Sequence, residues 1–143
     1  MPANRSEWIS LRLLALSNRY LAPVHARIED HYGLSRDDVA VLVHLAASET
    51  ATAQEIVRHT GRPKNSMSRS VVSLEQRGMI LRRPHPTDGR AAVLQLTAKG
   101  RKLCEVLAEA FGEADERLLE SLDESERAAF VHSLITMSNE AAT

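Results

Sequence analysis

Two short helices joined by a glycine turn are the feature that most constrains this chain. Thr52 is followed three residues later by Glu55, the spacing of a capping box, which opens a short helix over residues 53–60. Gly61 ends that helix, and Pro63 stands where the first turn of a second helix is expected. A short helix, a tight turn and a second helix together predict a helix-turn-helix.

A β-hairpin is predicted directly after the second helix, which ends at Gln76 or Arg77 before Gly78. Residues 79–83 and 92–96 are β-prone, and the segment between them contains two prolines and then Asp-Gly, a combination typical of a turn between strands. A hairpin in this position forms the wing of a winged helix-turn-helix.

Amphipathic helices are predicted on both sides of this unit. The first spans about residues 6–31, is interrupted by Pro23 and ends at Gly33. Ser35 opens the next helix, Thr97 opens a long helix from residue 98 to about 120, and Asp123 opens the last one. The predicted fold class is mainly α with a small β-hairpin wing. The apolar stripes predict these inward residues: Val24, Ile28, Val39, Leu42, Val43, Ala46, Met67, Val71, Leu74, Leu103, Val106, Leu107, Ala110, Ala114 and Leu118.

Charge is strongly segregated along the chain, although the total is only −1. Residues 1–57 carry a net charge of −2, residues 58–102 carry +9 and residues 103–143 carry −8. Local potential rather than total charge governs attraction to a polyanion. The middle third, which contains the helix-turn-helix and the hairpin, is therefore predicted to bind DNA.

The second helix of the helix-turn-helix offers the side chains expected of a DNA-reading helix. No acidic residue occurs between Arg58 and Leu74. Arg bonds guanine edges, Asn bonds adenine edges and Ser bonds bases or phosphates, while a helix N-terminus favours a phosphate. The predicted contacts in the major groove are Arg62, Pro63, Lys64, Asn65, Ser66, Ser68 and Arg69.

The tip of the hairpin is also cationic. Arg82, Arg83, His85 and Arg90 surround it, and a narrow β-ribbon of this kind places Arg in the minor groove. Asp88 lies two residues before Arg90, and we expect its carboxylate to hold the Arg90 guanidinium by paired hydrogen bonds. The predicted wing contacts are Arg83, His85, Asp88 and Arg90.

An ordered set of motifs resembles the signature of the MarR family of winged-helix regulators. The set consists of Leu74-Glu75-Gln76-Arg77-Gly78-Met79-Ile80, then Arg83, then Asp88-Gly89-Arg90, then Leu96-Thr97-Ala98-Lys99-Gly100. The resemblance implies a homodimer that binds a pseudo-palindromic operator, acts by default as a repressor, and is released by a small ligand or an oxidant. It also implies a DNA-binding domain at residues 35–97 and a helical dimerisation region at residues 1–34 and 98–143.

The terminal helices independently indicate a partner. The first helix carries two apolar stripes, more than one packing face needs, and the last two helices carry several large apolar residues in an acidic setting. Unpaired apolar faces on terminal helices are most simply covered by a second copy of the chain.

The resemblance also implies a site for a small-molecule effector, such as one of the aromatic-acid type, between the first two helices, the DNA-reading helix and the start of the long helix. The candidate residues are Trp8, Arg12, Leu16, Arg19, Tyr20, His44, Met67, Leu103 and Val106. Arg19, Tyr20 and His44 are the polar members that could meet an anion such as an aromatic carboxylate.

Other function classes are less compatible with the sequence. The six His residues show no paired metal-ligand spacing, and Cys104 lies beside an inward residue, so metal and thiol sensing remain alternatives with weaker support. A winged helix that binds protein would lack the cations that this chain keeps. No phosphate loop or nucleophile elbow indicates an enzyme or a cofactor, and no apolar run indicates a membrane span. The single Cys fits a reducing cytoplasm.

Overall fold

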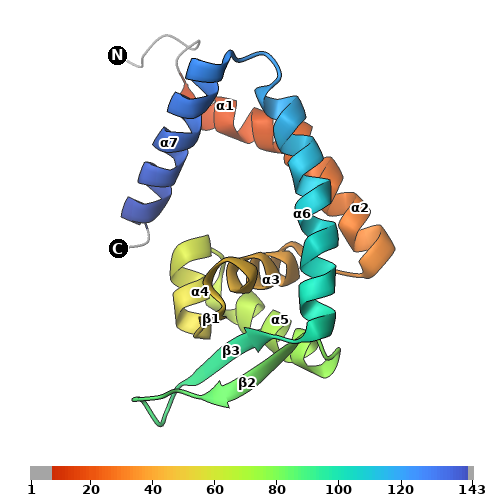
Figure 1. The fold of residues 1–143 in the computed structure, drawn as a ribbon, viewed down its shortest axis with the longest axis vertical. Coiled ribbons are helices and arrows are strands. Elements are labelled where there is room, and N and C mark those ends of the chain that lie inside the picture. The colour runs from red at the N-terminus through yellow and green to blue at the C-terminus, as the bar shows by residue number, and fades with distance from the viewer. Residues whose placement is uncertain (1–7, 142–143) are drawn as a thin grey trace.

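The computed structural model describes residues 8–141 and contains a winged helix-turn-helix from which helices extend on one side (Figure 1). The winged unit consists of α3 (Arg36–Ser48), β1 (Thr50–Ala51), α4 (Ala53–Thr60), α5 (Lys64–Gln76), β2 (Ile80–Pro84) and β3 (Ala92–Leu96). The other elements are α1 (Ile9–Leu16), the π-helical segment η2 (Ser17–Leu21), α2 (Ala22–Tyr32), α6 (Ala98–Leu119) and α7 (Glu124–Ala141). In Figure 1, α6 rises from the winged unit, and α7 folds back from its far end. The predicted fold class is confirmed.

Local capping chemistry sets most helix ends, as the sequence predicts. The Ser35 hydroxyl accepts a hydrogen bond from the backbone N–H of Asp38 at 3.1 Å, and the Asp38 carboxylate accepts one from the backbone N–H of Ser35 at 2.9 Å. The same reciprocal pair forms at the starts of α4 and α7. Gly33 and Gly61 end their helices with positive φ angles of 63° and 66°, a conformation that favours glycine.

A three-stranded antiparallel sheet with the order β1-β3-β2 forms the wing. The hairpin of β2 and β3 is confirmed, whereas β1 was not predicted. This strand has two residues, and its partners are Gln95 and Leu94, more than forty positions further along the chain. Such a short strand exists because of this long-range pairing, so no local pattern predicts it.

The core lies where α3, α5, the sheet and the lower part of α6 meet. Its most buried side chains include Leu42, Leu45, Met67, Leu74 and Leu94. Three predicted inward residues are exposed instead, namely Val43, Ala46 and Val106. Val43 and Ala46 line a cavity rather than the core.

The exposure of Val106 has a simple geometric cause. The buried residues of α6 are Gly100, Cys104, Leu107 and Ala114, so the predicted Leu107 and Ala114 are buried but the stripe runs through Cys104 rather than Val106. The Cys104 thiol donates to the backbone oxygen of Leu42 at 3.4 Å, so this face of α6 rests on α3 and turns Val106 toward solvent.

The first predicted helix is interrupted at the expected place but in an unexpected form. Proline lacks the N–H that would continue the α-helical ladder, and its ring clashes with the preceding turn. The chain responds with the wider π turn of η2, in which the backbone N–H of Ala22 donates to the oxygen of Ser17, and Pro23 then stands in the first turn of α2.

Candidate nucleic-acid interface

The N-terminal turn of α5 has backbone donors that no side chain caps. Pro63 immediately precedes the helix in an extended conformation and supplies no capping bond. This corrects the prediction that Pro63 lies in the first helical turn. In contrast, α3, α4 and α6 begin with side-chain caps from Ser35, Thr52 and Thr97. The N–H groups at the start of α5 can therefore bind an anion such as a phosphate.

The two faces of α5 divide as the sequence predicts. Its inner face buries Met67, Val71 and Leu74, while Lys64, Asn65, Ser68 and Arg69 are exposed. Ser66 is half-buried, and its hydroxyl donates to the backbone oxygen of Pro63 at 3.0 Å. Ser68 donates similarly to the oxygen of Lys64 at 3.0 Å.

Arg62 has a structural partner within the chain that its sequence position does not predict. Its Nε donates to the carboxylate of Asp37 at the start of α3. The pKa of Asp37 is lowered, chiefly by the hydrogen bond from Arg62, although burial opposes the shift. The Arg62 side chain is 42% exposed, so it lies at the edge of the interface while anchored to α3.

The wing uses some of its polar side chains to hold its own shape. Arg83 donates to the side-chain oxygen of Gln95 at 3.0 Å. The Nδ1 atom of His85 accepts from the backbone N–H groups of Thr87 and Asp88, at 3.2 and 3.0 Å. His85 therefore organises the turn at the tip.

The predicted contact between Asp88 and the guanidinium of Arg90 is wrong. Asp88 instead accepts a hydrogen bond from the backbone N–H of Arg90 at 3.0 Å. The two-residue separation explains this, because a short Asp side chain readily closes a local turn on the backbone. In the part of the chain that the structure describes, the Arg90 guanidinium takes part in no ion pair.

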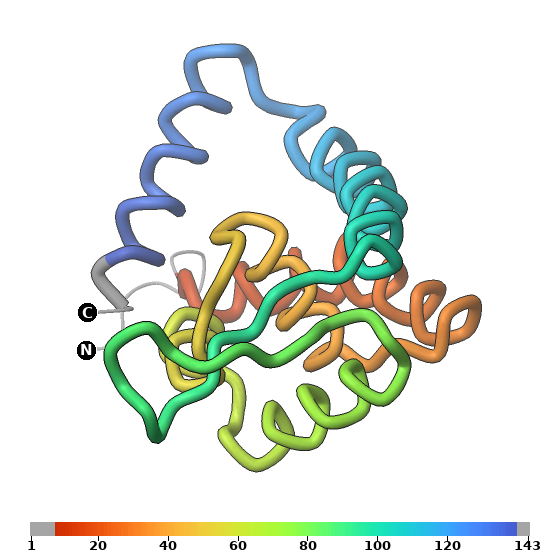
Figure 2. Tube along the Cα trace, turned by 60° about the horizontal axis from the view of Figure 1, so that its bottom comes forward, coloured from red at the N-terminus to blue at the C-terminus, as the bar shows by residue number. Residues whose placement is uncertain are grey.

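The helix and the wing present these groups on a common side of the molecule. Figure 2 shows α5 and the tip of the hairpin along the same lower edge of the molecule. Within residues 8–141, Lys64, Asn65, Arg69 and Arg90 form no side-chain hydrogen bond or ion pair. The arrangement leaves cations and an amide exposed for an external partner.

A cavity of about 680 Å³ lies behind this interface, between α2, α3, α4 and α6. Its lining combines small apolar residues with cationic and imidazole side chains, and no Asp or Glu among the described residues belongs to it. The polar and aromatic lining residues are His25, Arg36, His44, His59, Thr60, Arg62, Cys104 and Phe111.

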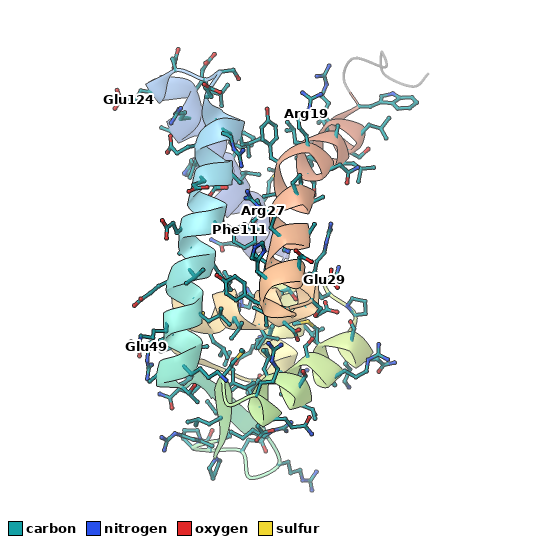
Figure 3. All side chains as sticks on the ribbon, turned by 90° about the vertical axis from the view of Figure 1, so that its right-hand side faces the viewer. Arg19, Arg27, Glu29, Glu49, Phe111 and Glu124 are labelled. Atoms are coloured by element: carbon teal, nitrogen blue, oxygen red, sulfur yellow. The ribbon has the colours of Figure 1, made fainter. Side chains whose placement is uncertain are left out.

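The imidazoles of the cavity are held in an electropositive setting. His25 packs edge-on against Phe111 with the ring centres 5.3 Å apart, and Figure 3 shows Phe111 between α6 and α2. The pKa of His25 is lowered by burial and by the charges of Arg36 and Arg62, and its Nδ1 has no hydrogen-bond partner among the described residues. His44 lies 5.2 Å from His59 between ring centres, and burial and His59 lower its pKa while Glu55 opposes the shift.

Comparison with known proteins identifies the fold and the family. The model of the MarR family matches residues 32–91. The transcriptional regulator BilQ of Clostridium symbiosum is 33% identical over 95 residues, which span 66% of this chain and 66% of BilQ. The chain belongs to the MarR family.

Solved MarR-family structures have the same fold over nearly the whole chain. A Listeria monocytogenes regulator solved with a 26-base DNA has 16% identity and a TM-score of 0.78, covering 98% of this chain and 90% of its own. Bordetella bronchiseptica BpsR, whose DNA binding is regulated by 6-hydroxynicotinic acid, has 22% identity and a TM-score of 0.75, covering 92% and 99%. The family consists of transcriptional regulators.

The MarR-like motif at the start of α6 has a clear physical basis. The Thr97 hydroxyl accepts from the backbone N–H of Gly100 at 3.1 Å and donates to the backbone oxygen of Gly78 at 2.6 Å. The backbone N–H of Thr97 donates to the oxygen of Met79 at 3.0 Å. Gly100 sits so close to Met79 that a side chain there would meet the Met79 carbonyl. The motif therefore joins the long helix of this MarR-family chain to the base of its wing.

The structure brings one of the nine predicted effector residues to the cavity wall, namely His44. Met67 is fully buried in the core, Leu103 is partly buried against the core, and Val106 is exposed. Leu16 and Tyr20 are half-buried and Arg19 is exposed on the first helical segments, with Trp8 and Arg12 near their start. His25, Arg36, His59, Arg62 and Phe111 line the cavity but were not predicted, because their convergence depends on tertiary packing.

The sensor alternatives can be placed as well. Cys104 is buried, and burial raises the pKa of its thiol, which disfavours the reactive thiolate. Among residues 8–141, no three His, Cys, Asp or Glu side chains are grouped so that they could hold a metal ion. None of the helices in this described part has both the length and the apolar character to cross a membrane.

Proposed function

We propose that this MarR-family chain is a cytoplasmic, ligand-responsive repressor that binds a pseudo-palindromic operator as a homodimer. Residues 35–97 would bind DNA, and residues 1–34 and 98–143 would form the dimerisation region. A small effector of the aromatic-acid type would release the DNA.

The observation that carries the DNA-binding proposal is the unpaired polar surface of α5 and the wing. Lys64, Asn65 and Arg69 lie beside an uncapped helix N-terminus, and Arg90 lies at the wing tip. Helix N-termini and cations bind phosphates, whereas Asn and Arg read base edges. The related Listeria regulator has been solved in complex with DNA, which supports the same use of this surface.

A salt titration of binding to fluorescent genomic DNA fragments tests this role. A dimer that neutralises roughly 6–10 phosphates loses about 10³–10⁵ in affinity between 50 and 200 mM salt. A protein-binding winged helix would show no such dependence, and that result would refute the DNA-binding proposal.

Single substitutions test the two contacting elements. Arg90→Ala should weaken operator binding at least tenfold without changing the dimer, because it removes the wing-tip cation. Arg117→Ala, which removes an exposed cation near the far end of α6, is the matched control and should have little effect. Asn65→Ala and Arg69→Ala should each relax base preference by about 1–3 kcal/mol, the usual worth of a bidentate hydrogen-bond pair to a base edge. Unchanged selectivity in both would contradict the major-groove assignment of α5.

Exposed apolar residues on the terminal helices support the homodimer. Ile9, Leu14, Ile135 and Met137 are each more than half exposed, and none of residues 124–139 is buried within the chain. A second copy would cover these faces and remove that apolar area from water.

Light scattering of two charge substitutions tests the interface. Ile135→Asp should shift the dimer toward monomer, while Val106→Asp, at an exposed apolar site of α6 beside α2, should not. A wild-type monomer at micromolar concentration would refute the homodimer.

The electropositive cavity supports an effector that carries an acid group. Its described lining contains Arg36 and Arg62 without any carboxylate, and Phe111 offers an aromatic wall. BpsR responds to 6-hydroxynicotinic acid, an aromatic acid, which favours the same ligand class here. Thermal-shift screening of aromatic acids against their neutral amides tests this class, and stabilisation by the amides alone would contradict it.

A further inference from the structure

One residue belongs both to the cavity and to the approach to the DNA-reading helix. Arg62 lines the cavity and lies two residues before α5 begins at Lys64. Its Nε is held by the Asp37 carboxylate, which comes from a different helix, 25 positions earlier in the chain. The side chain that a cavity ligand would meet is therefore the one that ties the start of α5 to α3.

Asp37 is placed to control several groups of the DNA-reading segment. It is buried and accepts the hydrogen bond from Arg62, and nearby Ser66 and the charge of Arg69 also help to keep the pKa of its carboxyl group low. These three residues are all predicted DNA contacts. Through its bond to Arg62, this carboxylate ties the turn before α5 to the start of α3.

An anion in the cavity would compete with Asp37 for the same guanidinium. Asp37 does not line the cavity, and no other acid of the described residues does, so Arg62 and Arg36 are the charges that a carboxylate ligand would find there. Arg carries several N–H donors in a rigid fork, and a bidentate pair with a carboxylate is its strongest arrangement. Turning the fork toward the ligand removes the donor from Asp37.

We propose that Arg62 relays ligand binding to DNA by exchanging Asp37 for the acid group of the effector. In the ligand-free protein the Asp37–Arg62 pair holds the start of α5 in its DNA-binding conformation. In the liganded protein Arg62 turns into the cavity, Asp37 loses its partner and the first turn of α5 shifts. The relay rests on the proposed effector function. Because coupling between two binding sites is reciprocal, the ligand must lower the affinity for DNA by the same factor by which DNA lowers the affinity for the ligand.

The test compares operator affinity with and without a saturating aromatic anion. The probe is 1-naphthoate, with 1-naphthamide as its neutral control, and the readout is the ratio of the two DNA dissociation constants for the full-length protein. For the wild type, naphthoate should weaken DNA binding at least tenfold, within the usual range of allosteric coupling, and naphthamide less than about twofold.

Asp37→Asn separates the relay from ligand binding. This variant keeps the shape of the side chain but removes the charge that holds Arg62. It should bind operator at least fivefold more weakly without ligand, still bind naphthoate, and show a ratio below about two, because Arg62 has already been released. Glu75→Gln is the matched control. It also removes the carboxylate of an Arg pair, with Arg82 at 2.8 Å, but neither residue lines the cavity, and the variant should keep the wild-type ratio.

Each outcome decides the relay. If Asp37→Asn binds naphthoate and keeps the wild-type ratio, the relay is wrong while the effector proposal stands. If neither probe binds the wild type at millimolar concentration, the effector cavity and the relay fail together, and operator binding by the same protein shows that DNA recognition is separate from both.

Discussion

The close backbone approach between α6 and the base of the wing predicts that a Gly→Ala substitution lowers the free energy of unfolding, although Ala normally stabilises a helix. Gly100 lies in the first turn of α6, and a Cβ there would overlap the backbone oxygen of Met79 and stand 3.1 Å from its carbonyl carbon. Both atoms belong to backbone, so the clash is relieved only by moving the helix away from the base of the wing. We therefore expect Gly100→Ala to be destabilising.

The size of the effect follows from three contributions. Forcing an extra methyl into a filled site costs about 1–3 kcal/mol. Displacing Met79 also weakens the hydrogen bond from the backbone N–H of Thr97, which is 3.0 Å long and contributes about 1 kcal/mol. The higher helix propensity of Ala returns about 1 kcal/mol. The net expectation is a decrease of about 2 kcal/mol in the free energy of unfolding.

Another glycine of the same helix is the control. Gly112 has nothing within 4 Å of an added Cβ, so Gly112→Ala should gain about 0.5–1 kcal/mol from helix propensity alone. Urea unfolding followed by circular dichroism, at one fixed protein concentration because a dimer is proposed, measures both variants. If Gly100→Ala is as stable as the wild type while Gly112→Ala is stabilised, the close approach to Met79 does not exist in solution.

Two further predictions concern titratable groups that line the cavity. Folding lowers the pKa values of His25 and His44 from 6.5, so below that pH the unfolded chain binds more protons than the folded protein. The contribution of these groups to the free energy of unfolding should therefore be constant above about pH 6.5, fall between pH 6.5 and the lowered pKa values, and level off below them. In urea titrations at pH 5–8, His25→Phe should remove part of this fall. Since burial raises the pKa of the Cys104 thiol, its reaction with Ellman's reagent should be at least tenfold slower in the native protein than in urea, and equal rates would show that the thiol is accessible.

Local chemistry made the helix ends and the DNA-reading face predictable. Ser35 with Asp38, Thr52 with Glu55 and Asp123 with Glu126 form their capping pairs over three residues, so the sequence alone contains both partners. The alternation of Met67 and Val71 with polar neighbours likewise depends only on helical periodicity.

The features that escaped prediction depend on distant parts of the chain. The Asp37–Arg62 pair joins residues 25 positions apart, and the contact of His44 with His59 needs α3 and α4 to be packed together. The effector candidates in α1 and η2 follow only from the general location between helices that the family resemblance implies. From the N-terminal helices the cavity wall receives only His25 of α2 among the described residues, and α1 and η2 do not reach it.

Because of the π turn in η2, the continuous helix formed by α1, η2 and α2 has two apolar faces that point in different directions. A π turn holds one residue more than an α turn, so the apolar stripe that follows it is rotated by about 100° relative to the stripe before it. Val24 and Ile28 of α2 thereby face the chain's own core, while Ile9 and Leu14 of α1 remain uncovered. An insertion or deletion of one residue within Ser17–Leu21 would rotate the exposed apolar stripe of α1 relative to α2 without replacing any core residue. In evolutionary terms, one inserted or deleted codon in this segment would redirect the surface that we propose to meet a second copy.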